Sequence, residues 1–215
     1  MKGLLLKDWY QVRTSMKAMC LTVAFVLVIW VLSTSSDYVF PVSYAAIFLG
    51  ILPVNLLAYD HASGWTEYSF ALPLSKELQV AEKYLVGLLC TAVSAALNGI
   101  FCGILFWMGK PLPAMPIGLL LGAGAASILL INGIMLPLYY RFGAEKARML
   151  YMLMFAGMGA ALGGGAVMDE LQQNGTGSGP LPVPLWLAAV LLLVVLALYA
   201  VSWRVSVAWY GKYKK

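Results

Sequence analysis

Few residues of this 215-residue chain are of the types that perform chemistry. Its one histidine, His61, follows Asp60 and has no second metal ligand beside it. The stretch from Gly103 to Lys110 has five residues between its glycines, where a phosphate-binding loop has four, and Pro111 follows it. Neither a His-Glu-x-x-His nor a Gly-x-Ser-x-Gly pattern occurs. The sequence therefore predicts no catalytic site, no metal site and no cofactor bound by this chain.

The composition indicates a membrane protein. Hydrophobic residues make up 62% of the chain and charged residues 11%, whereas an ordinary globular domain is about 25% charged. The mean hydropathy is +0.85. The charged residues separate six long uncharged stretches, and each can supply the roughly 20 apolar residues that a membrane-crossing helix needs. We predict an all-α polytopic protein of one transmembrane domain, 1–215, with six spans at about 18–36, 40–59, 85–107, 115–138, 149–168 and 185–203.

The basic residues predict the orientation of these spans. With the N-terminus inside, all but one of the 14 lysines and arginines fall on the cytoplasmic side, and only Lys110 lies outside. Both termini are then cytoplasmic. The net charge of +5 describes a cytoplasmic rim that attracts anionic lipid, rather than a nucleic-acid surface.

Residues 1–17 form a predicted amphipathic helix at the membrane interface. Leu5, Trp9, Val12 and Met16 recur at helical spacing, and the charged residues occupy other positions. Two interpretations stand side by side: a simple topological anchor, or an element that transmits motion.

The segment 60–84 is the longest passage that could not lie in hydrocarbon. Pro73 disfavours a helical Leu72. Ser75 is then a predicted N-cap, and Glu77 lies in the first turn, where a carboxylate opposes the positive end of the helix. The segment is either a linker on the bilayer surface or a docking element for a soluble partner.

The predicted spans contain no Asp, Glu, Lys, Arg or His. Ion-coupled carriers usually need ionisable groups at membrane depth, so the energy for transport should come from another protein. The strongly polar candidates for a translocation path are Asn55, Asn98 and Asn132. An uncharged path of this kind suits an apolar or amphipathic substrate.

Glycine pairs at four-residue spacing mark places where helices could approach closely. We expect tight packing within the subunit as their main role, and a dimer interface as the alternative. The pairs are Gly99 with Gly103, Gly118 with Gly122, and Gly159 with Gly163.

Three stretches resemble small bacterial ABC type-2 exporter permeases. They are the start, Met1-Lys2-Gly3-Leu4-Leu5-Leu6-Lys7-Asp8; the segment 60–84, through Asp60, Gly64-Trp65, Tyr68, Leu72-Pro73-Leu74-Ser75, Glu77 and Lys83-Tyr84; and 139–148, YYRFGAEKAR. The resemblance implies a multi-pass permease of a bacterial cell membrane, of Gram-positive type, that pairs with a second copy or a paralogue. It also implies a separate cytoplasmic ABC ATPase subunit, which holds ATP and Mg²⁺, in a complex of two permeases and two ATPases. The nearest group exports phenol-soluble modulins and similar amphipathic peptides.

The resemblance also assigns contacts with the ATPase to two cytoplasmic segments, a coupling segment at 60–84 and a lesser link at 139–148. The implied ATPase-coupling residues are Trp65, Glu67, Tyr68, Leu72, Pro73, Leu74, Ser75, Lys76, Glu77 and Lys83 in the first segment, and Phe142, Gly143, Glu145 and Lys146 in the second.

The sequence thus favours a permease subunit of an ATP-driven exporter, with a peptide toxin, an antimicrobial peptide or a drug as substrate. Two alternatives remain at this point. One is a non-transporting membrane scaffold or sensor that docks a soluble partner, and the other is an ion-coupled secondary transporter.

Overall fold

The computed structural model describes residues 2–15, 17–32, 39–71, 75–110, 117–172 and 185–210. These ranges are almost entirely helical and contain no strand. In chain order the elements are α1 (Lys2–Ser15), α2 (Lys17–Leu32), α3 (Val39–Ala62), α4 (Trp65–Ala71), α5 (Lys76–Trp107), α6 (Ile117–Gln172) and α7 (Leu185–Tyr210). The predicted all-α class is therefore confirmed for the described residues.

Within the described residues, four helical stretches are long and apolar enough to cross a membrane: Ser43–Ala62, Lys76–Trp107, Ile117–Gly143 and Ala189–Tyr210. A shorter apolar helix, Cys20–Leu32, lies within α2. Large apolar side chains, such as Phe25, Ile100 and Leu193, are exposed on α2, α5 and α7. Exposed apolar surface along several helices marks a membrane or protein contact, so the structure is that of a multi-pass membrane protein.

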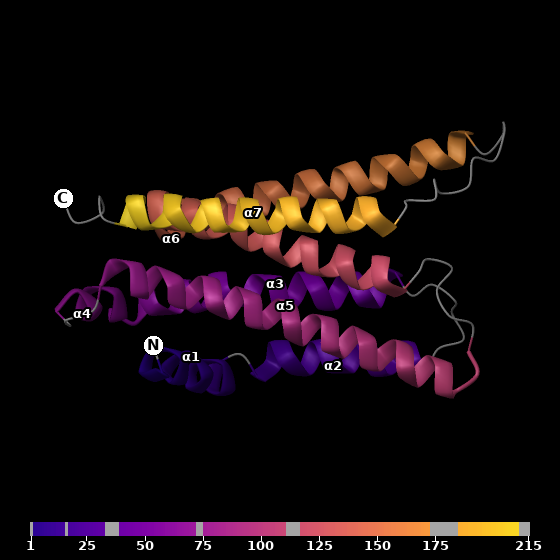
Figure 1. Cartoon of the computed structure of the whole chain (residues 1–215), viewed down its shortest axis with the longest axis horizontal. Coiled ribbons are helices and arrows are strands. Elements are labelled where there is room, and N and C mark those ends of the chain that lie inside the picture. The colour runs from indigo at the N-terminus through magenta and orange to yellow at the C-terminus, as the bar shows by residue number, and fades with distance from the viewer. Residues whose placement is uncertain are drawn as a thin grey trace.

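α6 consists of two arms that meet at Gly143. Its backbone angles, φ 79° and ψ 176°, are not helical, and such a positive φ is readily adopted by glycine because it has no Cβ. Figure 1 shows that the chain reverses direction between the two arms. The predicted link 139–148 is thus helical on both sides of this one residue.

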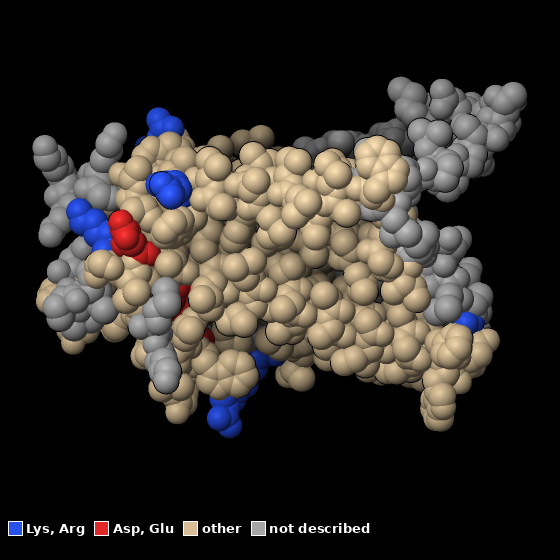
Figure 2. All heavy atoms as spheres, in the orientation of Figure 1, with Lys and Arg blue, Asp and Glu red and all other residues tan. Residues whose placement is uncertain are grey.

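The long helices run back and forth between two ends of the molecule. In Figure 1, α2, α3, α5, the two arms of α6, and α7 alternate in direction, and α4 lies at the same end as both termini. Most of the Lys, Arg, Asp and Glu atoms visible in Figure 2 lie toward this end, which we call the charged end.

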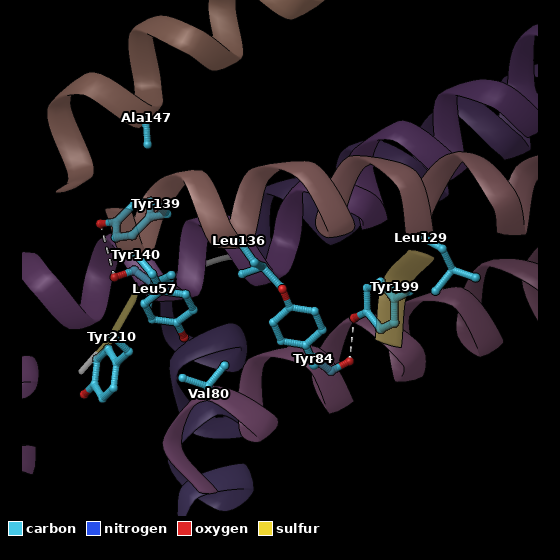
Figure 3. Packing of buried hydrophobic residues seen from close by; sticks show 10 residues of the cluster. All are labelled: Leu57, Val80, Tyr84, Leu129, Leu136, Tyr139, Tyr140, Ala147, Tyr199 and Tyr210. Atoms are coloured by element: carbon cyan, nitrogen blue, oxygen red, sulfur yellow. Dashed lines mark hydrogen bonds between the residues drawn. The ribbon is translucent and has the colours of Figure 1, made fainter. Parts of the chain in front are cut away.

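Hydroxyl groups join α5, α6 and α7 in the interior. The Tyr84 hydroxyl lies 2.7 Å from the hydroxyl oxygens of Ser202 and Ser206, and Ser202 donates to the carbonyl oxygen of Gly133. The Tyr199 hydroxyl donates to the Tyr84 carbonyl oxygen at 2.7 Å, a bond drawn in Figure 3. These bonds lie within the apolar cluster of Figure 3, so polar groups in this core satisfy one another.

Three glycines of the predicted pairs have open space around them. A Cβ at Gly99, Gly103 or Gly122 would meet nothing within 4 Å. The expectation that these three promote packing within the subunit is therefore wrong. A Cβ at Gly87, in contrast, would lie 2.5 Å from the Tyr199 hydroxyl oxygen.

Replacing Gly87 with alanine is expected to lower the free energy of unfolding by about 1–2 kcal/mol, as overpacking of a buried contact typically does. The new methyl group would displace the Tyr199 hydroxyl from the Tyr84 carbonyl. Denaturation in mixed detergent micelles would measure the loss. Gly99→Ala is the matched control on the same helix, since its methyl group enters open space. Equal stability of the two variants would contradict the prediction.

Candidate functional site

A cluster of five charged side chains lies at the charged end, on three helices that are distant in sequence. Lys7 and Asp8 come from α1, Asp60 from the end of α3, and Glu82 and Lys83 from the start of α5. Both aspartates, Glu82 and Lys83 are at most 4% exposed. Burial of this many ionisable groups is unusual unless they are paired.

The two lysines and the two aspartates pair with one another. Lys83 Nζ lies 2.8 Å from both carboxylate oxygens of Asp8 and 2.7 Å from Asp60 Oδ2. Lys7 Nζ lies 2.7 Å from both oxygens of Asp60 and 3.1 Å from Asp8 Oδ1. Each lysine thus bridges both aspartates, and these four charges balance.

Glu82 is the surplus charge of the cluster. Its Oε1 atom lies 3.6 Å from Lys83 Nζ and 3.9 Å from Lys7 Nζ. This atom is buried and has no hydrogen-bond partner among the described residues. With all five groups ionised, the cluster carries a net charge of −1 (two positive and three negative).

The cluster fastens α1 to the ends of α3 and α5. On α1, Leu5 and Val12 pack against the apolar core formed by α3, α5 and α6, with Asp8 buried between them in the sequence. Trp9, predicted to share a face with Leu5 and Val12, is instead exposed. The face of α1 that carries Leu5, Asp8 and Val12 therefore contacts the rest of the protein, whereas Trp9 is exposed.

The start of α5 matches its predicted N-terminus. Ser75 has extended backbone angles, and its side-chain oxygen accepts a hydrogen bond from the Leu78 amide at 3.3 Å. Glu77 lies in the first turn. The predicted N-cap is confirmed, while Leu72, Pro73 and Leu74 lie outside the described residues.

Polar contacts join α4 to α5 and α7. Gln79 Nε2 donates to the Ser69 carbonyl oxygen at 3.2 Å, and Ser69 Oγ donates to Gln79 Oε1 at 3.2 Å. The Tyr210 hydroxyl also donates to Gln79 Oε1. Ser69, Gln79 and Tyr210 were not among the predicted site residues, because their roles depend on contacts between helices that sequence spacing does not show.

The predicted coupling residues divide into an exposed and an inward group. Tyr68 is 59% exposed, and its ring lies 5.5 Å from that of Trp65. Trp65 is half-buried, with the Lys7 ammonium 4.7 Å from its ring centroid. Lys83 points inward, into the charged cluster. The exposed members are Tyr68, Ser75, Lys76, Glu77, Phe142 and Lys146, whereas the side chains of Glu67 and Glu145 lie outside the description.

A cavity of about 60 Å³ lies between the charged cluster and the two predicted coupling segments. Tyr140 and Tyr210 stand edge to face there, with ring centroids 5.3 Å apart. Figure 3 shows these two tyrosines and Tyr139 together near Leu57 and Val80. The charged and polar residues that line the cavity are Asp60, His61, Thr66, Ser69, Gln79, Glu82 and Lys83; Leu4, Leu57, Trp65, Tyr139, Tyr140, Gly143 and Tyr210 complete the wall.

The candidate path residues lie inside the subunit. Asn132 Nδ2 donates to the Ile128 carbonyl at 2.9 Å, and Asn98 Nδ2 donates to Ser94 Oγ at 3.4 Å. The carbonyl oxygen of each amide is buried without a hydrogen-bond partner among the described residues. Asn132 lies beside Gly87 of α5. Asn98 follows Gly87 by 11 residues, which is about 16 Å along the helix. Asn55 is half-buried on α3. The described contacts do not join the three into one lined path.

The helices and their charged end define a multi-pass helical membrane protein. The family model described as ABC-2 family transporter protein matches residues 3–211. The chain therefore belongs to the ABC-2 transporter family and is an ABC type-2 permease, which confirms the resemblance at the level of the family. Members of this family are the transmembrane component of an ABC transporter, and they normally work with a cytoplasmic ATPase subunit. Comparison with curated proteins and with solved structures gave no match.

Proposed function

We propose that this chain is the permease subunit of an ATP-driven exporter that moves an apolar or amphipathic substrate out of a Gram-positive bacterial cell. The substrate classes are a peptide toxin, an antimicrobial peptide or a drug. Six crossings place both termini, α4 and the start of α5 in the cytoplasm. The alternation of the helices in Figure 1 and the positive-inside pattern of the sequence support this topology.

A separate cytoplasmic ABC ATPase, carrying ATP and Mg²⁺, docks on the charged end. One observation carries this proposal: α4, which presents the exposed Tyr68, is joined by partly buried polar contacts to the long helices α5 and α7. The Ser69–Gln79–Tyr210 contacts connect α4 to α5 and α7, and the charged cluster connects α5 to α1 and α3. Closure of an ATPase pair on α4 would therefore move several spans together.

Lys83 has a supporting role in this arrangement. Its ammonium is hydrogen-bonded to two aspartates in the interior, so a direct contact with the ATPase would require the cluster to open. The proposed contacts remain Trp65, Tyr68, Lys76 and Glu77, with a second group formed by Phe142 and Lys146 on either side of the reversal at Gly143.

Two copies of the chain would complete the transporter, in a complex of two permeases and two ATPases. Gly99, Gly103 and Gly122 have open space around them, so their small size is available for contact with a second permease. A path between two subunits also agrees with the separation of Asn98 from Gly87, the neighbour of Asn132, by about 16 Å along α5.

Tyr68→Ala is expected to weaken binding of the ATPase by about 5- to 30-fold, because truncation of an interface tyrosine typically costs about 1–2 kcal/mol. The affinity would be measured by titrating the purified ATPase onto the permease in nanodiscs. Trp107→Ala is the control, since Trp107 is 87% exposed at the opposite end of α5. Equal affinities of the two variants would refute docking at α4.

The transport function needs its own measurement. Liposomes that contain the permease and the ATPase should accumulate a fluorescent amphipathic peptide only when ATP is present, and the peptide should stimulate ATP hydrolysis. Binding of the ATPase without any movement of peptides or drugs would favour a scaffold. Uphill transport by the permease alone would show an ion-coupled carrier instead.

A further inference from the structure

We infer that the cavity beside Glu82 receives one basic side chain, an arginine or a lysine, from the ATPase subunit. This inference rests on the proposed function and names the chemistry of the contact. It starts from the unequal pairing of the charged cluster. Lys7 and Lys83 direct their close contacts to Asp8 and Asp60, at 2.7–3.1 Å. The Oε1 atom of Glu82 lies farther from these two ammonium groups, at 3.6 Å and 3.9 Å.

A buried carboxylate oxygen without a hydrogen-bonding partner is costly, and buried charges in proteins are normally paired. Glu82 is 4% exposed, and its Oε1 atom has no hydrogen-bond partner among the described residues. With all five groups ionised, one positive charge at this atom would pair it and bring the net charge of the cluster from −1 to zero. Glu82, the group that a cation would pair, therefore lies in the wall of the cavity.

The cavity has the size and lining for the end of one side chain. Its volume of about 60 Å³ is several times the 10–15 Å³ that a single water requires. Trp65, Tyr140 and Tyr210 stand around it, and aromatic rings attract a cation placed over their faces. Trp65 already has one ammonium, that of Lys7, 4.7 Å from its ring centroid.

A side chain of a docked protein is the favoured source of this cation. His61, which is exposed, and Trp65 and Thr66, which are half-buried, belong to the wall of the cavity together with Gly143. The cavity thus lies between the two segments proposed to contact the ATPase. A metal ion fits less well, because the described residues contain no group of three His, Cys, Asp or Glu side chains able to hold one.

The first experiment compares Glu82→Gln with Glu77→Gln in the complete complex. Both changes remove one negative charge at the start of α5, but Glu77 is exposed. Titration of the ATPase onto the permease in nanodiscs should show at least about 30-fold weaker binding for Glu82→Gln, since loss of one partner of a buried charge pair typically costs 2 kcal/mol or more. Glu77→Gln alters one of the proposed contacts with the ATPase, but it should weaken binding less than about 5-fold, because pairs of exposed charges contribute little.

The second experiment identifies the basic residue of the ATPase that pairs with Glu82. Each surface arginine and lysine of the ATPase is replaced by methionine, and binding to the native permease and to Glu82→Gln is compared. One replacement should weaken binding to the native permease and have little further effect on Glu82→Gln, which is the sign of direct coupling. Glu82→Asp, which keeps the charge, provides a second permease variant for the same cycle if Glu82→Gln is not recovered folded.

Several results would overturn the inference. One is unchanged affinity of folded Glu82→Gln, which would mean that Glu82 is neutral and needs no cation. Another is the absence of any coupled basic residue on the ATPase. A third is the same loss of binding on deletion of residues 211–215, which would identify this chain's own basic end as the occupant. If Tyr68→Ala still weakens binding in these cases, the proposed docking stands and only the inference fails.

Discussion

Replacing Lys83 with methionine is expected to lower the free energy of unfolding by about 3–5 kcal/mol, the usual cost of removing one partner from a buried ion pair. Asp8, Asp60 and Glu82 would keep only the Lys7 ammonium as a counter-charge. Thermal unfolding in detergent and the yield of monodisperse protein would measure the effect. Lys76→Met is the matched control, because Lys76 lies on the same helix but is exposed.

A second substitution tests whether charge balance is the cause. Adding Asp8→Asn to Lys83→Met removes one negative charge along with the positive one, so the net charge of the cluster returns to −1. The double variant should recover part of the lost stability, and this recovery would show the coupling between the two groups. If Lys83→Met were as stable as Lys76→Met, the buried pairing would contribute nothing to folding.

Replacing Gly143 with alanine is expected to cost up to about 3 kcal/mol. The residue has φ 79° and ψ 176°, a region that is essentially restricted to glycine. It is also where α6 reverses, and it lines the cavity beside Glu82. The variant should therefore unfold at lower denaturant than wild type, and the two arms of α6 should become more accessible to protease at the reversal.

Gly122→Ala is the control for this change, because Gly122 lies in the first arm of α6, and its added methyl group would meet nothing within 4 Å. Alanine in a helix is intrinsically favoured over glycine, so in detergent-dispersed monomers, where no second permease contacts Gly122, the control should be at least as stable as wild type. A Gly143→Ala variant that behaved like this control would mean that the reversal tolerates another backbone conformation.

The helical class could be predicted from the sequence because hydrocarbon imposes a simple requirement. A run of about 20 apolar residues that crosses a bilayer must satisfy its backbone hydrogen bonds internally, and a helix does so. The start of α5 was predictable for a local reason, since a serine N-cap acts on an amide three residues away. The Ser75 bond to Leu78 confirms this local rule.

The glycine pairs show where such reasoning fails. Spacing of four residues places two glycines on one helix face but does not indicate which neighbour, if any, that face contacts. Gly87, which belongs to no predicted pair, is the glycine that Tyr199 approaches most closely. The side chain that occupies the space comes from α7, more than 100 residues later in the chain.

The sequence by itself determined that this protein is a helical membrane protein, on which side of its predicted spans the basic residues gather, and which family it resembles. These properties follow from composition, from local periodicity and from short motifs. Only the tertiary structure decided that Lys83 points inward, that Asp8 and Asp60 pair with it, and that Glu82 is left without a hydrogen bond at Oε1. Lys83 meets Asp8 across 75 positions of the sequence, and Lys7 meets Asp60 across 53. Such partners are selected by the packing of α1, α3 and α5, because the burial of one charge creates the need for another from whichever helix lies beside it.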